Sequence, residues 1–265
     1  MATPEVPPRP DGLHASQIPT ADTTAVGVAG RPKATWTWWE GLAIYVVSFL
    51  VAGVATLPIL TLLKRDEDLA NIASTTVAAI VIVAVLVAWL SKSHPAWRQI
   101  MGFPARGEWW HQIRASIGFG LLLYPAMVFV VGVIVSLILQ ALSGEAVRAP
   151  EQVPSQLSAV ATAITVLYAI VVAPIHEELF FRGILFRGVR DRYGLLPGLL
   201  VTGAGFGLIH FIDGPWQGTI LLMGVMVING MALGWWYERR GTIVASIVAH
   251  MVFNVIGLTL ILATR

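Results

Sequence analysis

Residues 41–63 read GLAIYVVSFLVAGVATLPILTLL, a run of 23 residues without Asp, Glu, Lys or Arg. An α-helix needs about 20 apolar residues to cross the hydrocarbon core of a bilayer, so this run is long enough to span a membrane. Six further runs of this kind follow, at Leu69–Leu90, Ala115–Leu142, Ser155–Ile175, Leu195–Ile212, Pro215–Tyr237 and Gly241–Thr264. The sequence therefore predicts an all-α, polytopic membrane protein with about seven transmembrane helices, since isolated strands in lipid would leave their backbone groups unpaired.

The composition excludes an ordinary water-soluble globule. Hydrophobic residues make up 56% of the 265-residue chain and charged residues only 12%, against about 25% charged residues in soluble domains. The chain has no cysteine, which rules out disulfide bonds, Cys-ligated metals and a thiol nucleophile. The net charge of +2 gives no reason to expect nucleic acid as a partner. Because of the long apolar runs, we expect membrane lipids to surround the protein.

The first 39 residues differ in composition from the rest. They hold six of the 15 prolines, among Ala, Thr and Asp residues, and such a composition is typical of disorder. They lack the short apolar core of a cleavable signal peptide. We therefore expect a disordered cytoplasmic tail at 1–39, N-terminal transmembrane helices at 40–150, and transmembrane helices that carry the candidate catalytic residues at 151–265.

The Lys and Arg residues predict the orientation in the membrane. Thirteen of the 17 lie in the tail and in segments 91–114, 182–192 and 238–241, and the other four are Lys64, Arg65, Arg148 and Arg265. Because Lys- and Arg-rich loops stay in the cytoplasm, we predict a cytoplasmic N-terminus and a C-terminus on the opposite side. The expected location is the cytoplasmic membrane of the cell, crossed several times.

Ionisable and strongly polar side chains cluster in the C-terminal half. At mid-helix such side chains cost about 2.5–3.5 kcal/mol each on insertion scales, so they mark functional sites by default. The cluster comprises His176, Glu177, Glu178 and Arg182 in PIHEELFFRG, His210 in FGLIH, and His250 with Asn254 in HMVFN.

The spacing of these residues predicts one shared pocket. Glu178 and Arg182 lie four residues apart and share a helix face, whereas Glu177 points about 100° away from Glu178. If this helix continues past Ile175 to about Arg190, Glu177 lies 16 residues before Tyr193, and His210 lies 16 residues after Gly194. In an antiparallel hairpin the two are then level, and His250 and Asn254 reach the same depth from the next turn.

Two imidazoles, a carboxylate and a carboxamide at this depth suit the activation of water for attack on an amide. Glu177 can take a proton from water, and Asn254 can donate to a developing oxyanion. His210 and His250 can bind Zn²⁺ or another divalent cation together with Glu177, or they can hydrogen-bond the water without a metal. Both mechanisms fit the residues.

Other protease classes lack their motifs in this chain. The residues after His176-Glu177 do not include the second histidine of a His-Glu-x-x-His zinc helix, and no Gly-x-Ser-x-Gly nucleophile motif occurs. Asp191 and Asp213 fall in predicted loops, so we do not expect a buried aspartyl pair.

At these residues the chain resembles the CPBP family, which groups CAAX prenyl endopeptidases with bacteriocin-processing and immunity-associated membrane proteins. The family motifs Glu-Glu-x-x-x-Arg, Phe-x-x-x-His and His-x-x-x-Asn correspond here to Glu177-Glu178-Leu-Phe-Phe-Arg182, Phe206-Gly-Leu-Ile-His210 and His250-Met-Val-Phe-Asn254. The resemblance covers residues 173–254, and the N-terminal half shares only its apolar character.

The resemblance implies an intramembrane endopeptidase. Glu177 would activate water, His210 would position that water or a metal, and His250 and Asn254 would stabilise the oxyanion or ligate metal. Glu178 and Arg182 would orient their helix. The candidate catalytic residues are thus Glu177, Glu178, Arg182, His210, His250 and Asn254, and the candidate metal ligands are Glu177, His210 and His250.

The expected substrate is a membrane-associated peptide or protein, of the prenylated CAAX type or another, that enters from the cytoplasm or laterally from lipid. A non-catalytic immunity or scaffold protein and a proton-coupled transporter are the alternatives. A transporter would favour interrupted, repeated helices in both halves, whereas the polar cluster occupies only one half. The oligomeric state stays open.

Overall fold

The computed structural model describes residues 31–105, 107–154 and 156–264, and within these ranges the chain forms helices joined by loops, without a β-strand. Six helical runs are long and apolar enough to cross a membrane: α1 (Trp38–Leu62), α2 (Glu67–Ser93), Trp109–Ser143, Ala159–Tyr193, α10 (Trp216–Arg240) and α11 (Ile243–Ala263). A further apolar helix, α9 (Leu195–Leu208), is shorter. The all-α, polytopic class with about seven helices is confirmed.

The third long run changes its hydrogen bonding at a proline. A short helix, α3 (Trp97–Ile100), precedes it, and the run itself comprises α4 (Trp109–Pro125), η2 (Ala126–Gly132) and α5 (Val133–Ser143). η2 is π-helical and begins directly after Pro125. Because proline has no backbone N–H and its ring crowds the preceding turn, the change of helix type at this point follows from the sequence.

The fourth long run carries the two adjacent glutamates. It comprises α6 (Ala159–Leu167), η3 (Tyr168–Val172), α7 (Ala173–Glu178), η4 (Leu179–Phe186) and α8 (Arg187–Tyr193). The prediction that this helix continues past Ile175 to about Arg190 is confirmed. The segments η3 and η4 are π-helical, a conformation frequent at functional sites, and they flank α7.

Helix α9 is shorter than the sequence predicted. We expected a span over Leu195–Ile212, but the helix ends at Leu208, ahead of the turn-forming Asp213-Gly214-Pro215. Its 14 residues extend about 21 Å, less than the roughly 30 Å of a hydrocarbon core. His210 therefore lies just past the helix end rather than within a full span.

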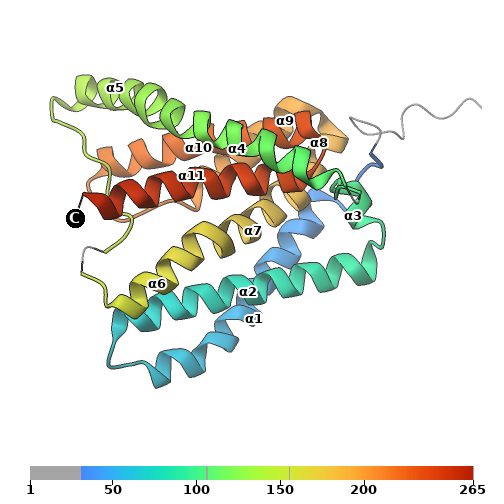
Figure 1. The fold of residues 1–265 in the computed structure, drawn as a ribbon, viewed down its shortest axis with the longest axis horizontal. Helices are drawn as coiled ribbons and strands as arrows, with labels where there is room; N and C mark the ends of the chain where they lie inside the picture. The colour runs from blue at the N-terminus through green and yellow to red at the C-terminus, as the bar shows by residue number, and fades with distance from the viewer. Residues whose placement is uncertain (1–30, 106, 155, 265) are drawn as a thin grey trace, which may run out of the picture.

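The helix 159–193 lies at the centre of the fold. It contacts α1 through η4 and α8, α2 through α6 and α7, α11 through η3 and α7, and α9 through η4 and α8. Around it, α1 pairs with α2, α4 with α11 and α9 with α10. Figure 1 shows α1 and α2 on one side and α4, α5, α10 and α11 on the other.

The molecule has two different ends. We call the end that carries α3 and α8 the basic end, at the right in Figure 1; α8 ends at Tyr193. The opposite end, which carries the C-terminal end of α11 and residues 144–154 and 156–158, together called the segment 144–158, is the distal end, at the left. The segment 144–158 crosses from α5 to α6 at the distal end and so joins the two sides of the fold.

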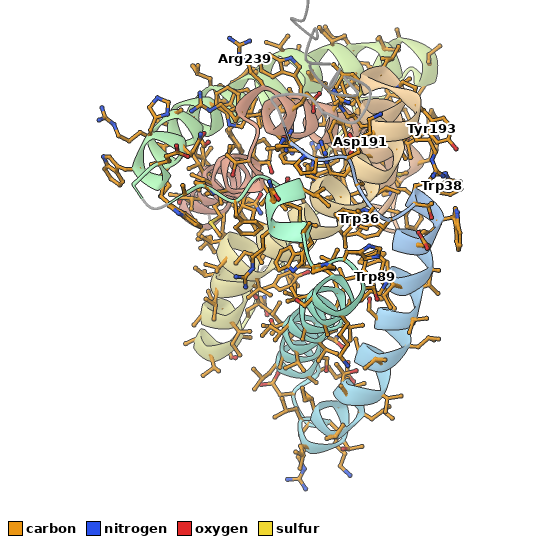
Figure 2. The ribbon with its side chains drawn as sticks, turned by 90° about the vertical axis from the view of Figure 1, so that its right-hand side faces the viewer. Trp36, Trp38, Trp89, Asp191, Tyr193 and Arg239 are labelled. Carbon is orange, nitrogen blue, oxygen red and sulfur yellow. The ribbon has the colours of Figure 1, made fainter. Side chains whose placement is uncertain are left out.

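Residues 31–37 pack on the basic end, although the sequence assigned them to the disordered tail of 1–39. The Trp36 indole Nε1 donates a hydrogen bond to the Ile184 carbonyl at 3.0 Å, and the Ala34 amide donates to Asp191 Oδ2 at 2.8 Å. Trp36 is 3% exposed and packs edge to face on Trp89. Both residues are labelled in Figure 2. Residues 1–30 of the expected tail lie outside the described residues.

A network of buried ion pairs closes the basic end. Arg187 Nη2 lies 2.8 Å from Asp191 Oδ2, and Arg190 Nη2 lies 2.7 Å from Glu238 Oε1. Arg31 lies 3.7 Å from Glu238 and over the ring of Tyr237. Asp191 is thus helical and paired, not part of a loop as expected, because the helix ends only at Tyr193.

Glycines allow α9 and α10 to pack closely. Gly203 and Gly207 face Val227 on α10. A Cβ atom added at Gly207 would overlap the Val227 side chain and lie 2.7 Å from the Met223 carbonyl oxygen. The four-residue spacing of small residues therefore serves close helix contact, as it does in membrane helix pairs generally.

We predict that Gly207→Ala lowers stability by about 1–3 kcal/mol, because the new methyl group would overpack the interface with α10. Thermal unfolding of the detergent-purified proteins would measure the loss. Gly53→Ala on α1 is the matched control, since a Cβ atom there meets nothing within 4 Å. An unchanged midpoint for Gly207→Ala would contradict the packing described.

Candidate active site

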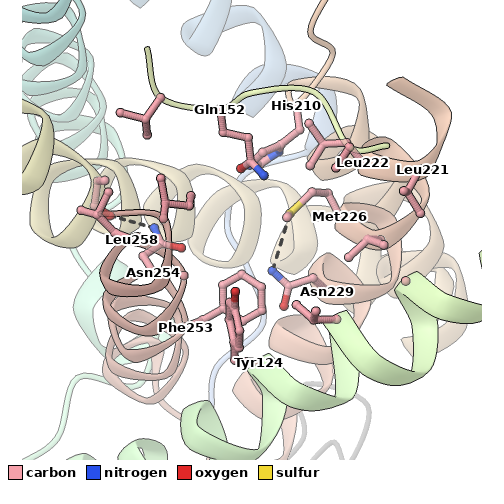
Figure 3. A pocket seen from close by; sticks show the side chains of 18 of the residues that line it. Tyr124, Gln152, His210, Leu221, Leu222, Met226, Asn229, Phe253, Asn254 and Leu258 are labelled. Carbon is pink, nitrogen blue, oxygen red and sulfur yellow. Dashed lines mark hydrogen bonds between the residues drawn. The ribbon is translucent and has the colours of Figure 1, made fainter. Parts of the chain in front are cut away.

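One cavity of about 540 Å³ brings together four of the side chains predicted from the sequence. Glu177 comes from α7, His250 and Asn254 come from α11, and His210 follows α9. These three elements meet because the helix 159–193, which contains α7, contacts both α9 and α11. Figure 3 shows His210 and Asn254 at the cavity wall, together with residues of α10.

Glu177 and His250 face one another in this cavity. The distance from Glu177 Oε2 to His250 Nε2 is 3.8 Å, and Glu177 Oε2 has no hydrogen-bond partner among the described residues. Both side chains are largely buried, at 12% and 3% exposure. A buried carboxylate oxygen without a partner is costly, so its partner must come from the contents of the cavity.

Glu178 lies behind the cavity and holds His250. Its Oε1 accepts a hydrogen bond from Arg182 Nη1 at 2.8 Å and lies 2.9 Å from His250 Nδ1. Arg182 Nη2 donates to the Gly230 carbonyl on α10 at 3.0 Å. Glu178 and Arg182 are fully buried and do not line the cavity, so they position His250 rather than touch a substrate.

These contacts define the tautomer of His250. A carboxylate accepts hydrogen bonds, so the proton resides on Nδ1, which faces Glu178. In the neutral ring, Nε2 is then an acceptor and faces Glu177 and the cavity. His250 can therefore hydrogen-bond a water molecule placed between it and Glu177.

His210 is oriented in a similar way by a backbone group. Its Nδ1 lies 2.7 Å from the carbonyl oxygen of Phe206, which can only accept, so Nδ1 carries the proton. The Phe206 ring is fully buried and packs against the rings of His210 and His250. Phe206 of the second motif thus acts by packing and by its carbonyl group.

Asn254 is tied to the central helix. Its Nδ2 donates a hydrogen bond of 2.7 Å to the carbonyl oxygen of Ala169 in η3. A carboxamide has two N–H groups, so one remains for a ligand in the cavity. Outside the cavity, His176 bonds Tyr45 at 3.1 Å and stacks on its ring, which is a packing role.

The three predicted metal ligands do not form a three-ligand site. Among the residues that the structure describes, no group of three or more His, Asp or Glu side chains is placed to hold a metal ion. Glu177 and His250 lie within reach of one shared ion, but His210 does not complete the set. The side chains present therefore do not fit a His₂Glu zinc centre.

Comparison with known families identifies the same part of the chain. The family model of type II CAAX prenyl endopeptidases, Rce1-like, matches residues 159–256, a range that includes all three motifs. A search of curated proteins gave no match, and neither did a search of solved structures.

Residues 159–256 match this family model, and we call them the CPBP domain for their similarity to that family. This confirms the resemblance and, in general terms, an intramembrane endopeptidase. The match begins at the first residue of α6 and ends within α11, so the central helix of the fold is the first helix of the CPBP domain.

Among the polar residues of the cavity that sequence reasoning did not select, Asn229 is the most buried asparagine. Asn229 on α10 is 1% exposed and lines the cavity with Glu177 and Asn254. It is the only asparagine in the uncharged run 215–237. An asparagine within an apolar run could have indicated a functional site. Asn229 belongs to none of the three motifs, however, and the motifs alone do not identify it.

The cavity of the CPBP domain extends toward the distal end. From Glu177 at mid-helix it reaches Ala149, Gln152 and Val153 of the segment 144–158, and Leu258 and Ile261 of α11. Toward the basic end, the buried Arg182 and the ion-pair network close the interior. The expected access from the cytoplasm would lie at the basic end, where no lining residue of the cavity is found in the described ranges.

We predict that Arg182→Met lowers stability by about 3–5 kcal/mol, because it leaves the buried Glu178 without its cation. Arg182→Lys retains the charge but loses the two-point contact with Glu178 and Gly230, so we expect an intermediate value. The measurement is thermal unfolding in detergent, with the exposed Arg239→Met as control. Equal midpoints for Arg182→Met and Arg239→Met would contradict the role assigned to this pair.

Proposed function

We propose that the protein hydrolyses a peptide bond by means of water activated by Glu177. The observation that carries this proposal is Glu177 Oε2, which has no partner among the described residues and lies 3.8 Å from His250 Nε2 at the cavity wall. A carboxylate and an imidazole at this separation can share one water molecule. The match of the CPBP domain to the family model supports the reaction class.

The proposed reaction uses only side chains of this chain. Glu177 removes a proton from the water as the water oxygen forms a bond to the substrate carbonyl carbon. His250 Nε2 accepts the second hydrogen of that water and so orients it. The free N–H of Asn254 donates to the developing oxyanion. His210 Nε2 is an acceptor, because Nδ1 carries the proton, and it can accept a hydrogen bond from a substrate N–H and so orient the scissile amide. As the C–N bond breaks, Glu177 returns its proton to the leaving amine.

No step of this proposal passes through a metal ion, because the described residues do not provide a third ligand beside Glu177 and His250. The family resemblance still predicts Zn²⁺ or another divalent cation as a cofactor. Activity that is lost on chelation and restored by Zn²⁺ would show that the cavity rearranges to bind the ion and would replace the metal-free mechanism.

The proposed substrate is a membrane-associated peptide, with prenylated CAAX-type peptides as the first candidates because the matching family model describes CAAX prenyl endopeptidases. The lining of the cavity supports an apolar substrate, since Val128, Leu137, Leu222 and Leu258 form much of its wall. Such a wall offers burial to apolar groups on either side of the scissile bond.

We expect Glu177→Gln to lower the rate of cleavage by about 10²–10⁴-fold, the usual contribution of a general base. Purified protein would be incubated with fluorogenic peptides made with and without a C-terminal farnesyl cysteine. Glu67→Gln, at an exposed position on α2, is the matched control and should cleave as the unaltered protein does. Full activity of both Glu177→Gln and His210→Ala would refute the assignment and favour a non-hydrolytic immunity, scaffold or transport role.

We infer further that substrate reaches the cavity from the distal end and that this end faces away from the cytoplasm. The excess of Lys and Arg at the basic end supports a cytoplasmic location for that end. The cavity lining at residues 149–153 and 258–261 supports access at the other. The N-terminus would then be cytoplasmic in a multi-pass protein of the cell membrane.

Cysteine labelling tests this orientation, because the natural chain has no cysteine. A membrane-impermeant maleimide should label Arg65→Cys and Gln152→Cys in intact cells, but Lys92→Cys only after permeabilisation. Labelled Gln152→Cys should also cleave the peptides more slowly, since this residue lines the cavity. Labelling of Lys92→Cys alone in intact cells would reverse the orientation.

A further inference from the structure

The carboxamide of Asn229 lacks the partners that a buried amide requires. Its side chain is 1% exposed, and its only hydrogen bond among the described residues runs from Nδ2 to the thioether sulfur of Met226 at 4.0 Å. Its Oδ1 has no hydrogen-bond partner among the described residues. A carboxamide can donate two hydrogen bonds and accept two, and leaving these unmade in an apolar interior is costly.

The position of Asn229 shows where a partner would come from. Asn229 lines the same cavity as Glu177, His250 and Asn254, and Figure 3 shows its side chain across the cavity from Asn254. No described protein group donates a hydrogen bond to its Oδ1. The partners of this carboxamide must therefore be supplied by a molecule that occupies the cavity.

The wall that carries Asn229 is held in place by the catalytic framework. The next residue, Gly230, accepts a hydrogen bond of 3.0 Å from Arg182 through its carbonyl group. A Cβ atom at Gly230 would lie 2.8 Å from Phe206 Cβ, so α10 and α9 are in close contact here. Asn229 therefore has a defined position relative to Glu178 and His250, and hence to the water that Glu177 is proposed to activate.

We propose that Asn229 binds the backbone of the substrate peptide, an inference that rests on the proposed function. A peptide that enters an apolar cavity must satisfy its own N–H and C=O groups. One carboxamide offers the complementary pair, with Oδ1 accepting from a substrate N–H and Nδ2 donating to a substrate carbonyl. Asn229 is thus a substrate-binding residue that recognises a peptide unit independently of the substrate side chains.

A purely structural role would require different contacts. An asparagine that joins membrane helices donates or accepts across the helix interface, as Asn254 does toward Ala169. The contact of Asn229 stays within its own helix and involves only sulfur. A hydrocarbon chain alone would give this carboxamide no partner, so the residue indicates a ligand with peptide-like polarity.

Asn229→Leu tests the proposal, because leucine has a similar volume but cannot form hydrogen bonds. We expect KM for the fastest-cleaved peptide of the farnesylated and unmodified panel to rise about tenfold, with kcat changed less than about twofold. The thermal midpoint of the ligand-free protein should stay equal or rise, since only the weak 4.0 Å contact with the Met226 sulfur is lost. Asn71→Leu, at an exposed position on α2, is the matched control.

Two results would overturn the proposal. One is a KM for Asn229→Leu equal to that of Asn71→Leu, and the other is a marked fall in the thermal midpoint of ligand-free Asn229→Leu, which would indicate a structural role. The same peptides at saturating concentration should raise the midpoint of the unaltered protein by linkage, and should raise that of Asn229→Leu less. The shift of the midpoint tests peptide binding at Asn229 even if no peptide is cleaved. Absence of cleavage would therefore count against the proposed function and not against the role of Asn229.

Discussion

A single carboxylate oxygen, Glu178 Oε1, connects the parts of this site. It lies within hydrogen-bond distance of both Arg182 Nη1 and His250 Nδ1, and Arg182 in turn reaches the backbone of α10 at Gly230. One fully buried group thereby relates the central helix, α10 and α11. Such a pair adds little net stability compared with apolar packing, but removing one partner is strongly destabilising. The ring orientation and tautomer of His250 follow from this contact, and with them the acceptor that faces Glu177.

The two adjacent glutamates therefore have different environments and different roles. Glu178 is fully buried and paired through Oε1 with Arg182 and His250, whereas Glu177 lines the cavity, where its Oε2 has no partner among the described residues. The same division extends to the whole molecule. At the basic end, ion pairs between Arg187 and Asp191 and between Arg190 and Glu238 close the interior. At the distal end, the cavity reaches the segment 144–158. Rigid packing on one side and an accessible cavity on the other suit an enzyme that holds its catalytic groups fixed while a peptide enters.

Much of the fold and of the site could be predicted from the sequence because the responsible signals are local. Uncharged runs of sufficient length defined the helices, and the four-residue spacing of Glu178 and Arg182 defined their pairing. Counting from the turn at Gly194 placed Glu177 level with His210, which the shared cavity bears out. Other features depend on tertiary contacts that no local pattern encodes. Trp36 packs on Ile184, nearly 150 residues away, so the segment before α1 resembled a tail. Asn229 is recognised as a cavity residue only once α10 and α11 are placed on opposite sides of the cavity. The direction in which the cavity extends depends on the early end of α9 and on the path of the segment 144–158.

The central claim is that Glu178 acts on catalysis through His250. The most direct test is a double-mutant cycle on kcat for peptide cleavage, with Glu178→Gln, His250→Gln and the double variant, each first shown to be folded by its thermal unfolding. If Glu178 works by orienting His250, the double variant should lose no more activity than His250→Gln alone, because residues that act as one unit are not additive. Losses that multiply in the double variant would show that the two side chains act independently and would contradict this account.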